Sequence, residues 1–231
     1  MPTNTPAAVT HSSRAFSLIE LLAVITVLAV LSVLVFPYIS QMRQKANTTT
    51  ALSNLRQIYL GLTYYQNEHG KLPPLTSTVT NGPSAQEPFW NQRIIPYVEP
   101  DFVPPPAPEN QLPGVFYDPN ANSHNYRRGD FGVLYDSTRG PIRGFEAGSL
   151  SLAQIERPGH TVLLSSAEQS GPGNEPIGTF YINNNSRPSL GFPRMAEGHQ
   201  GMAVVCFADG SIHHISKADL YADGVLPFRN D

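Results

Sequence analysis

The sequence lacks much of the chemistry on which catalytic and metal-binding proteins depend. Its single cysteine, Cys206, excludes an intramolecular disulfide and every zinc motif built from several cysteines. Cys206 lies in the apolar stretch MAVVCF, which predicts a buried and unreactive thiol. Charged residues make up only 14% of the 231 residues, and the net charge is −3. No strongly basic surface is therefore expected, and we predict no nucleic-acid partner.

Motifs for catalysis and metal binding are also missing from the sequence. It contains no H-E-x-x-H, EF-hand or G-x-S-x-G pattern, and no glycine-rich loop that would cradle a phosphate. His199, Asp209, His213 and His214 are close in sequence, but His213 and His214 alternate along a predicted strand and point to opposite faces. The acidic residues near Asp209 lack the spacing of calcium ligands. We therefore predict neither an enzyme nor a bound metal or cofactor.

The most informative feature that is present is a long apolar segment from Phe16 to Phe36. At 1.5 Å per residue, a helix of this length spans roughly 30 Å, the thickness of a bilayer core. The apolar part of a cleaved secretory signal is shorter, and no A-x-A cleavage pattern follows this segment. The segment therefore predicts a membrane-spanning helix. Its only residues that are not apolar are Ser17, Glu20, Thr26 and Ser32.

Glu20 is unusual because a carboxylate within lipid is costly unless it has a partner. The nearest preceding cation, Arg14, is six residues away. A cut between Ala15 and Phe16 would create an α-amino group on Phe16 at a similar depth, and that cation could pair with Glu20. Alternatively, Glu20 lies close enough to the start of the segment for its carboxylate to reach the headgroups. The residues alone leave both explanations open.

The stretch RAFSLIELL resembles the processing site of type IV prepilins and type II secretion pseudopilins. The resemblance implies a cleavage site between Ala15 and Phe16, with Phe16 as the N-methylated first residue of the mature chain. Glu20 then occupies the fifth mature position, and Pro37 occupies the twenty-second, where the family often has proline. Ala15 differs from the family, which usually has glycine before the cut.

This resemblance also implies an α+β fold, in which a long N-terminal helix packs on a small antiparallel β-sheet. Four regions are expected. They are a leader peptide (1–15), a transmembrane and assembly helix (16–37), an amphipathic continuation of that helix (38–69), and a loop-rich, β-containing globular domain (70–231).

The function implied by the resemblance is that of a structural subunit. Prepilin peptidase would cut and methylate it in the inner membrane, with the C-terminal domain on the periplasmic or extracellular side. Other pilin or pseudopilin subunits would then assemble with it into a type IV pilus or a type II secretion pseudopilus. An alternative from another class is an uncleaved, single-pass membrane anchor that displays an extracytoplasmic binding domain. A membrane-tethered hydrolase lacks a recognisable nucleophile.

The continuation of the helix is predicted from its apolar spacing. Pro37 should kink the helix, the low-propensity residues 47–50 should weaken it, and Gly70 should end it in a left-handed conformation. The predicted apolar stripe consists of Leu52, Leu55, Tyr59 and Leu62, flanked by Ile58 and Tyr65.

The globular domain shows signals for short helices and several strands. A short helix is expected around Trp90, Ile94 and Ile95, with these side chains packed inward, and another is expected after Ser151, which has Gln154 at capping-box spacing. Strands are expected at 130–136, 160–166 and 178–182.

The segment MAVVCFADGSIHHIS predicts the last β-hairpin of the sheet. Asp209 and Gly210 join its two apolar stretches, and Asp-Gly favours a type I′ turn, in which both central residues have positive φ. Together with the preceding EGHQG, this segment resembles a C-terminal pattern of histidine followed by FADGS. That pattern occurs in a group of prepilin-like proteins that is abundant in planctomycetes.

Overall fold

The computed structural model describes residues 17–75, 89–103, 105, 111–121, 123–124, 129–135, 150–170, 175–179, 181–183, 194–216 and 218–219. The predicted leader and the cleavage site at Ala15 and Phe16 lie outside these residues. The chain forms two compact units, Met1–Arg43 and Gln44–Asp231. We call the second unit, Gln44–Asp231, the head.

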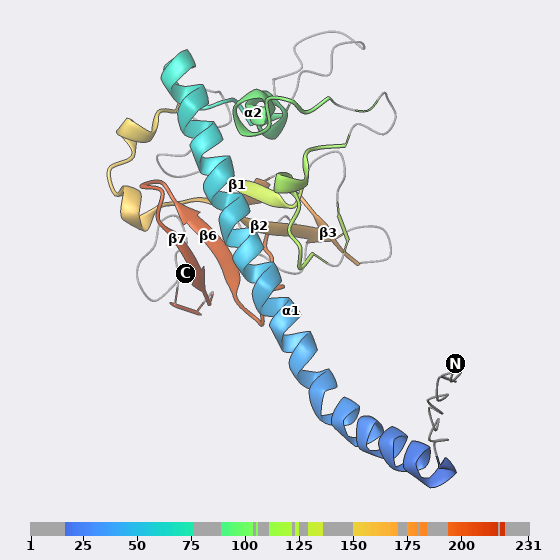
Figure 1. The fold of residues 1–231 in the computed structure, drawn as a ribbon. Helices are drawn as coiled ribbons and strands as arrows, with labels where there is room; N and C mark the ends of the chain where they lie inside the picture. Colours follow the sequence, from blue (N-terminus) through green and yellow to red (C-terminus); the bar gives the residue numbers. More distant parts are fainter. Residues whose placement is uncertain are drawn as a thin grey trace, which may run out of the picture. The chain divides into compact units, whose positions relative to one another are not determined.

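Helix α1 (Leu18–His69) is the longest element and contributes to both units (Figure 1). It stays helical through residues 47–50, where the sequence predicts a weak point. The hydroxyls of Thr48, Thr49 and Thr50 each donate to the carbonyl four residues earlier, at 2.9, 3.0 and 3.1 Å. α1 is also helical at Pro37, and the kink expected there stays a prediction.

Helix α1 ends where the sequence predicts, at Gly70. Gly70 has a φ of 76°, in the left-handed region, and its N–H donates to the carbonyl of Gln66 at 2.7 Å. This bond satisfies one of the carbonyls that the last helical turn leaves without a partner. Gly70 therefore stops the helix as predicted.

Within the head, α1 presents an apolar face to the core. Leu55 and Leu62 are fully buried, as predicted, whereas Leu52 and Tyr59 are only half-buried and pack at the edge of the core. The buried face of α1 is therefore rotated slightly around the helix from the predicted stripe. The residues at its centre follow each other at the three- and four-residue spacing of one helix face. The residues at this centre are Ala51, Leu55, Ile58, Leu62 and Tyr65.

Helix α2 (Trp90–Val98) packs against α1, and its position matches the helix predicted around Trp90. Trp90 and Ile94 are fully buried, and Ile95 packs against the core. The two helices meet at Gly61 of α1, where an added Cβ would lie 2.4 Å from Cγ2 of Val98. Glycine therefore permits the close approach of the helices at this point.

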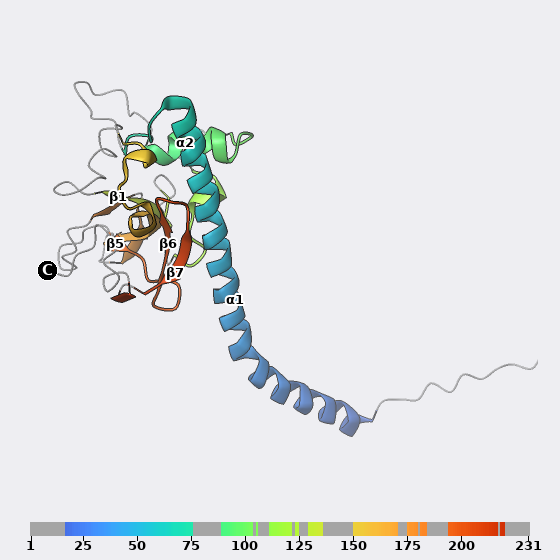
Figure 2. The ribbon, with the colours of Figure 1, turned by 90° about the vertical axis from the view of Figure 1, so that its left-hand side faces the viewer.

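The strands of the head form one sheet in the order β4–β1–β2–β6–β7, with β3 and β5 also paired to β2. Figures 1 and 2 show β6 and β7 beside the second half of α1. The strands are β1 (Phe131–Tyr135), β2 (Val162–Ser170), β3 (Pro176–Gly178), β4 (Tyr181–Asn183), β5 (Arg194–Met195), β6 (Ala203–Phe207) and β7 (Ile212–Ile215).

The predicted α+β fold, with a long N-terminal helix and a small sheet, is confirmed, but two predictions about the sheet were wrong. The sheet is mixed and not purely antiparallel, because β4 runs parallel to β1. The single strand predicted at 178–182 is divided between β3 and β4, which pair with β2 and β1 respectively. Gly132 of β1 lets the backbones approach, since an added Cβ would lie 2.8 Å from the Tyr181 carbonyl carbon. The alternation of apolar residues gives no information about such a change of partner.

The turn after Ser151 is a single 3-10 turn, Leu152–Gln154. The side-chain Oε1 of Gln154 accepts the Ser151 N–H at 2.9 Å, so Gln154 caps the turn as the spacing predicts.

Candidate functional site

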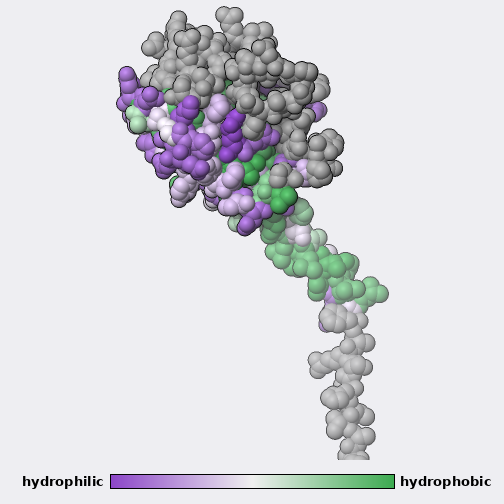
Figure 3. Space-filling model, turned by 90° about the horizontal axis from the view of Figure 1, so that it is seen from above, coloured by the Kyte–Doolittle hydropathy of each residue, from purple (hydrophilic) through white to green (hydrophobic). Residues whose placement is uncertain are grey.

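The first candidate site is the apolar part of α1 in the N-terminal unit. An 18-residue window of α1 has a mean hydropathy of 2.9, and none of this window is buried. Apolar side chains are exposed all around the helix, from Leu18 at 84% to Phe36 at 74% (green in Figure 3). The core helix of a soluble protein would bury these residues, so the segment has the properties of a membrane-spanning helix.

The polar residues in this segment are satisfied within the helix itself. Thr26 donates to the carbonyl of Ala23 at 2.8 Å, and Ser32 donates to the carbonyl of Leu28 at 2.7 Å. Such bonds lower the cost of placing a hydroxyl in hydrocarbon, where water is unavailable as a partner.

Glu20 has a local partner that the sequence analysis missed. Its Oε2 accepts the backbone N–H of Ser17 at 3.0 Å, so Glu20 caps the first turn of α1. The S-x-x-E spacing of Ser17 and Glu20 is that of a capping box and was the signal available for this contact. A neutral acceptor at position 20 would satisfy the same N–H. The cap therefore accounts for an oxygen at this position but does not require a charge.

Comparison with known proteins supports the interpretation of this segment. The family described as "Prokaryotic N-terminal methylation motif" matches residues 10–36, which include Phe16 and Glu20. No curated protein and no solved structure shows significant similarity to this chain. The match supports a prepilin-type protein that prepilin peptidase processes and that an apolar N-terminal helix anchors in a membrane.

The second candidate site is a buried polar network around His199 in the head. His199 is fully buried, and its Nε2 lies 2.9 Å from Oδ2 of Asp118, which is also buried. Its Nδ1 lies 2.8 Å from Nδ2 of Asn120 and 3.0 Å from Oγ1 of Thr48 on α1. His214 Nε2 donates to the backbone carbonyl of His199 at 2.9 Å. The network thus joins α1, the loop around Asp118, and β7.

The contacts fix the protonation of the His199 ring. The Pro119 carbonyl can only accept, so the group of Asn47 that faces it at 3.2 Å is the amide nitrogen, Nδ2. The same nitrogen donates to Oδ1 of Asn120 at 2.9 Å, which leaves Nδ2 of Asn120 to donate to His199 Nδ1. Nδ1 is therefore an acceptor, and Nε2 carries the proton that it donates to Asp118.

The order Asp118–His199–Thr48 resembles the carboxylate, imidazole and hydroxyl of a catalytic triad, but its geometry fits a structural role. The single hydroxyl proton of Thr48 can go either to the carbonyl of Gln44 or to His199 Nδ1, and the three side chains are each at least nine-tenths buried. A nucleophile must reach a substrate, and this hydroxyl lies inside the helix–loop contact. The sequence marks His199 as a candidate but gives no signal for its partners, which lie 79 to 151 residues away.

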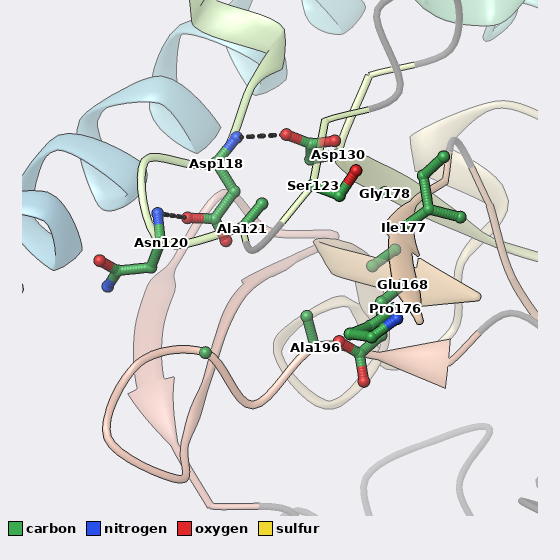
Figure 4. Close-up of a pocket in the computed structure, with 12 residues that line it drawn as sticks. Asp118, Asn120, Ala121, Ser123, Asp130, Glu168, Pro176, Ile177, Gly178 and Ala196 are labelled. Atoms are coloured by element: carbon green, nitrogen blue, oxygen red, sulfur yellow. Dashed lines mark hydrogen bonds between the residues drawn. The ribbon is translucent and has the colours of Figure 1, made fainter. Parts of the chain in front are cut away.

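A small pocket next to this network is lined by twelve residues, three of which are acidic (Figure 4). Asp118, Asp130 and Glu168 contribute to it, together with Gly178 of β3. Asp130 Oδ2 accepts the Asp118 N–H at 3.1 Å and contacts His124 Nδ1, while Asp118 Oδ1 accepts the Asn120 N–H at 2.8 Å. These oxygens already bind protein groups. Within the described part of the chain, no three His, Cys, Asp or Glu residues are arranged to hold a metal ion.

The hairpin between β6 and β7 forms where predicted, but its turn differs. Gly210 has a φ of 86°, whereas Asp209 is not among the described residues with positive φ. The Gly210 N–H bonds to the Phe207 carbonyl at 3.0 Å, which gives a three-residue loop with a glycine bulge instead of a type I′ turn. Asp209 Oδ1 accepts both N–H and O–H of Ser211, and these bonds lower the pKa of Asp209.

The chain has another turn, in which both central residues have positive φ. Its central residues are Gln200, with a φ of 60°, and Gly201, with a φ of 78°. The Met202 N–H closes this turn on the carbonyl of His199 at 3.2 Å. This turn was not predicted, because Gln-Gly is a weaker turn signal than Asp-Gly. Its effect is to fold the chain back so that His199 lies beside the start of β6.

Cys206 on β6 is fully buried, as the sequence predicts. Burial raises the pKa of its thiol to about 12, so the thiol stays protonated and unreactive at neutral pH in the folded protein. We expect iodoacetamide to label Cys206 only after unfolding by guanidinium, as measured by mass spectrometry. Rapid and complete labelling of the native protein at pH 7 would contradict this assignment.

Proposed function

We propose that this chain is a pilin-like structural subunit. Prepilin peptidase cuts it between Ala15 and Phe16 and methylates the new amino group. The mature subunit then assembles through its apolar helix into a type IV pilus or a type II secretion pseudopilus. Other subunits of that filament are its partners, the head lies on the periplasmic or extracellular side, and the chain itself catalyses no reaction.

The observation that carries this proposal is an acid placed in an otherwise apolar helix at a fixed distance from a cleavage motif. Glu20 lies four residues after Phe16, within the segment that matches the N-terminal methylation motif. After the cut, the Phe16 amine provides a cation that can balance the Glu20 carboxylate, within one chain or between neighbours. Burial of the exposed apolar side chains of α1 against other subunits then favours assembly.

The C-terminal pattern supports a finer assignment within prepilin-like proteins. His199 and the FADGS segment (207–211) resemble the pattern found in the planctomycete prepilin-like group. In this chain both parts of the pattern contact α1 in the head. We propose that the chain belongs to that group and that the pattern maintains the fold of the head.

The N-terminus of the mature protein tests the proposal. We expect mass spectrometry of the protein from cells with a working prepilin peptidase to give an N-methylated chain that starts at Phe16. Cells without the peptidase should yield the uncut chain, which serves as the control. A chain that keeps residues 1–15 in processing-competent cells would reject the proposal and favour the uncleaved membrane anchor.

A further inference from the structure

The segment His199–Ser211 contacts α1 at both of its ends. At the first end, His199 Nδ1 lies 3.0 Å from Oγ1 of Thr48. At the second end, the hydroxyl of Tyr59 donates to the carbonyl of Ala208 at 3.2 Å, and an added Cβ on Gly210 would lie 2.6 Å from the Tyr59 ring. Strand β6 connects the two ends. We call His199–Ser211 the strap.

The length of β6 is similar to the distance along α1 between its two contacts with the strap. Thr48 and Tyr59 are eleven residues apart, so they lie on one face of α1, about three turns and roughly 16 Å apart. The five residues of β6 cover roughly the same distance at about 3.3 Å per residue. β6 therefore joins two contacts with α1 that are separated by a similar distance along the helix.

The first contact of the strap lies at the weakest part of α1. Asn47 and the three following threonines have low helix propensity, and isolated helices are only marginally stable in water. The network around His199 binds two of these residues directly, because Asn47 donates to Asn120 and Thr48 contacts His199. The hydrogen bonds of this network therefore oppose local opening of α1 at 47–50.

We propose that the strap is a conformational lock that keeps α1 helical across residues 47–50 and fixes the position of the sheet along the part of α1 that lies in the head (44–69). Release of either end opens α1 locally while the sheet stays folded. This device belongs to the head alone and holds whether or not the chain assembles into a filament.

The first end is tested by two matched variants in the full-length protein in detergent micelles. Thr48→Val and Thr49→Val each remove one hydroxyl that lies within hydrogen-bond distance of the carbonyl four residues earlier, but only the Thr48 hydroxyl can donate to His199 of the strap instead. We expect Thr48→Val to speed hydrogen exchange of the amides in 48–59 by about tenfold, with little change in β1 and β2. Thr49→Val should exchange like the unmodified protein. Equal effects of the two variants, or equal acceleration throughout the sheet, would overturn the proposal.

The second end is tested by replacing each of two glycines with asparagine. Asparagine adopts the left-handed backbone conformation more readily than most residues, so the substitution mainly adds a side chain. Gly201 and Gly210 both have positive φ, but a Cβ on Gly201 meets no atom within 4 Å, whereas one on Gly210 meets the Tyr59 ring. We expect Gly210→Asn to speed exchange in 48–59 and Gly201→Asn to leave it unchanged. In a protein that already carries Tyr59→Ala, Gly210→Asn should cause no further increase in hydrogen exchange in 48–59. If the two glycine variants behave alike, the tip of the hairpin does not act through α1, and the proposal is wrong.

Discussion

Replacing Glu20 with glutamine is expected to leave cleavage and membrane insertion intact and to abolish incorporation into filaments. The glutamine side chain keeps an oxygen that can accept the Ser17 N–H, so the cap on the first turn of α1 is preserved. It lacks the negative charge that balances the Phe16 amine. An unpaired cation buried in an apolar interface costs several kcal/mol, so filament yield should fall by about a hundredfold or more.

The measurement compares purified filaments with the membrane fraction, and mass spectrometry confirms an N-terminus at Phe16 in both. Ser32→Ala is the matched control, because it removes a polar group from the same helix whose bond to Leu28 is entirely local. Filaments of Ser32→Ala should form normally. If Glu20→Gln also assembles normally while Glu20→Leu does not, Glu20 acts only as a helix cap, and the charge pairing is wrong.

Gly178→Ala is expected to destabilise the head by about 3 kcal/mol or more. An added Cβ would lie 1.7 Å from Oδ1 of Asp130 and 2.6 Å from its carboxyl carbon, so Asp130 would have to move. Asp130 is 1% exposed, and its Oδ2 accepts the N–H of Asp118. Its backbone carbonyl also accepts the Ala167 N–H at 2.8 Å. Displacing Asp130 therefore disturbs the loop and β2 together.

Trp90 provides the measurement, because it is the only tryptophan of the chain and is fully buried. Its fluorescence should report unfolding of the head by guanidinium in detergent micelles. Gly114→Ala is the control, since a Cβ there meets no atom within 4 Å. If Asp130 causes the clash, Gly178→Ala should cost little in a protein that already carries Asp130→Ala. Equal stability of the two glycine variants would contradict the structure at this point.

The features that the sequence predicted well are those set by neighbouring residues. The apolar segment of α1, the end of the helix at Gly70, the helix around Trp90 and the burial of Cys206 all follow from local pattern and composition. Glu20 was identified by its position in an apolar segment. Its cap on Ser17 was equally readable from S-x-x-E spacing but was overlooked.

The features that the sequence could not predict depend on residues far apart in the chain. Nothing near 178–182 indicates that the chain changes partner from β2 to β1 at this point. The turn type at Asp209 and Gly210 was misjudged for a related reason. Asp-Gly permits more than one hairpin loop, and the observed loop places Gly210 against Tyr59 on α1, 151 residues earlier.

By itself, the sequence determined that this protein has an apolar N-terminal helix with one acid at a fixed distance from a processing motif, because hydropathy and spacing are properties of consecutive residues. Only the tertiary structure decided which groups His199 contacts and that residues 47–50, despite their low helix propensity, are helical. A buried hydrogen bond requires two groups to meet in space, and local propensity does not say which distant residue will supply the second. In this protein, that distant partner keeps a poor helix-forming stretch helical.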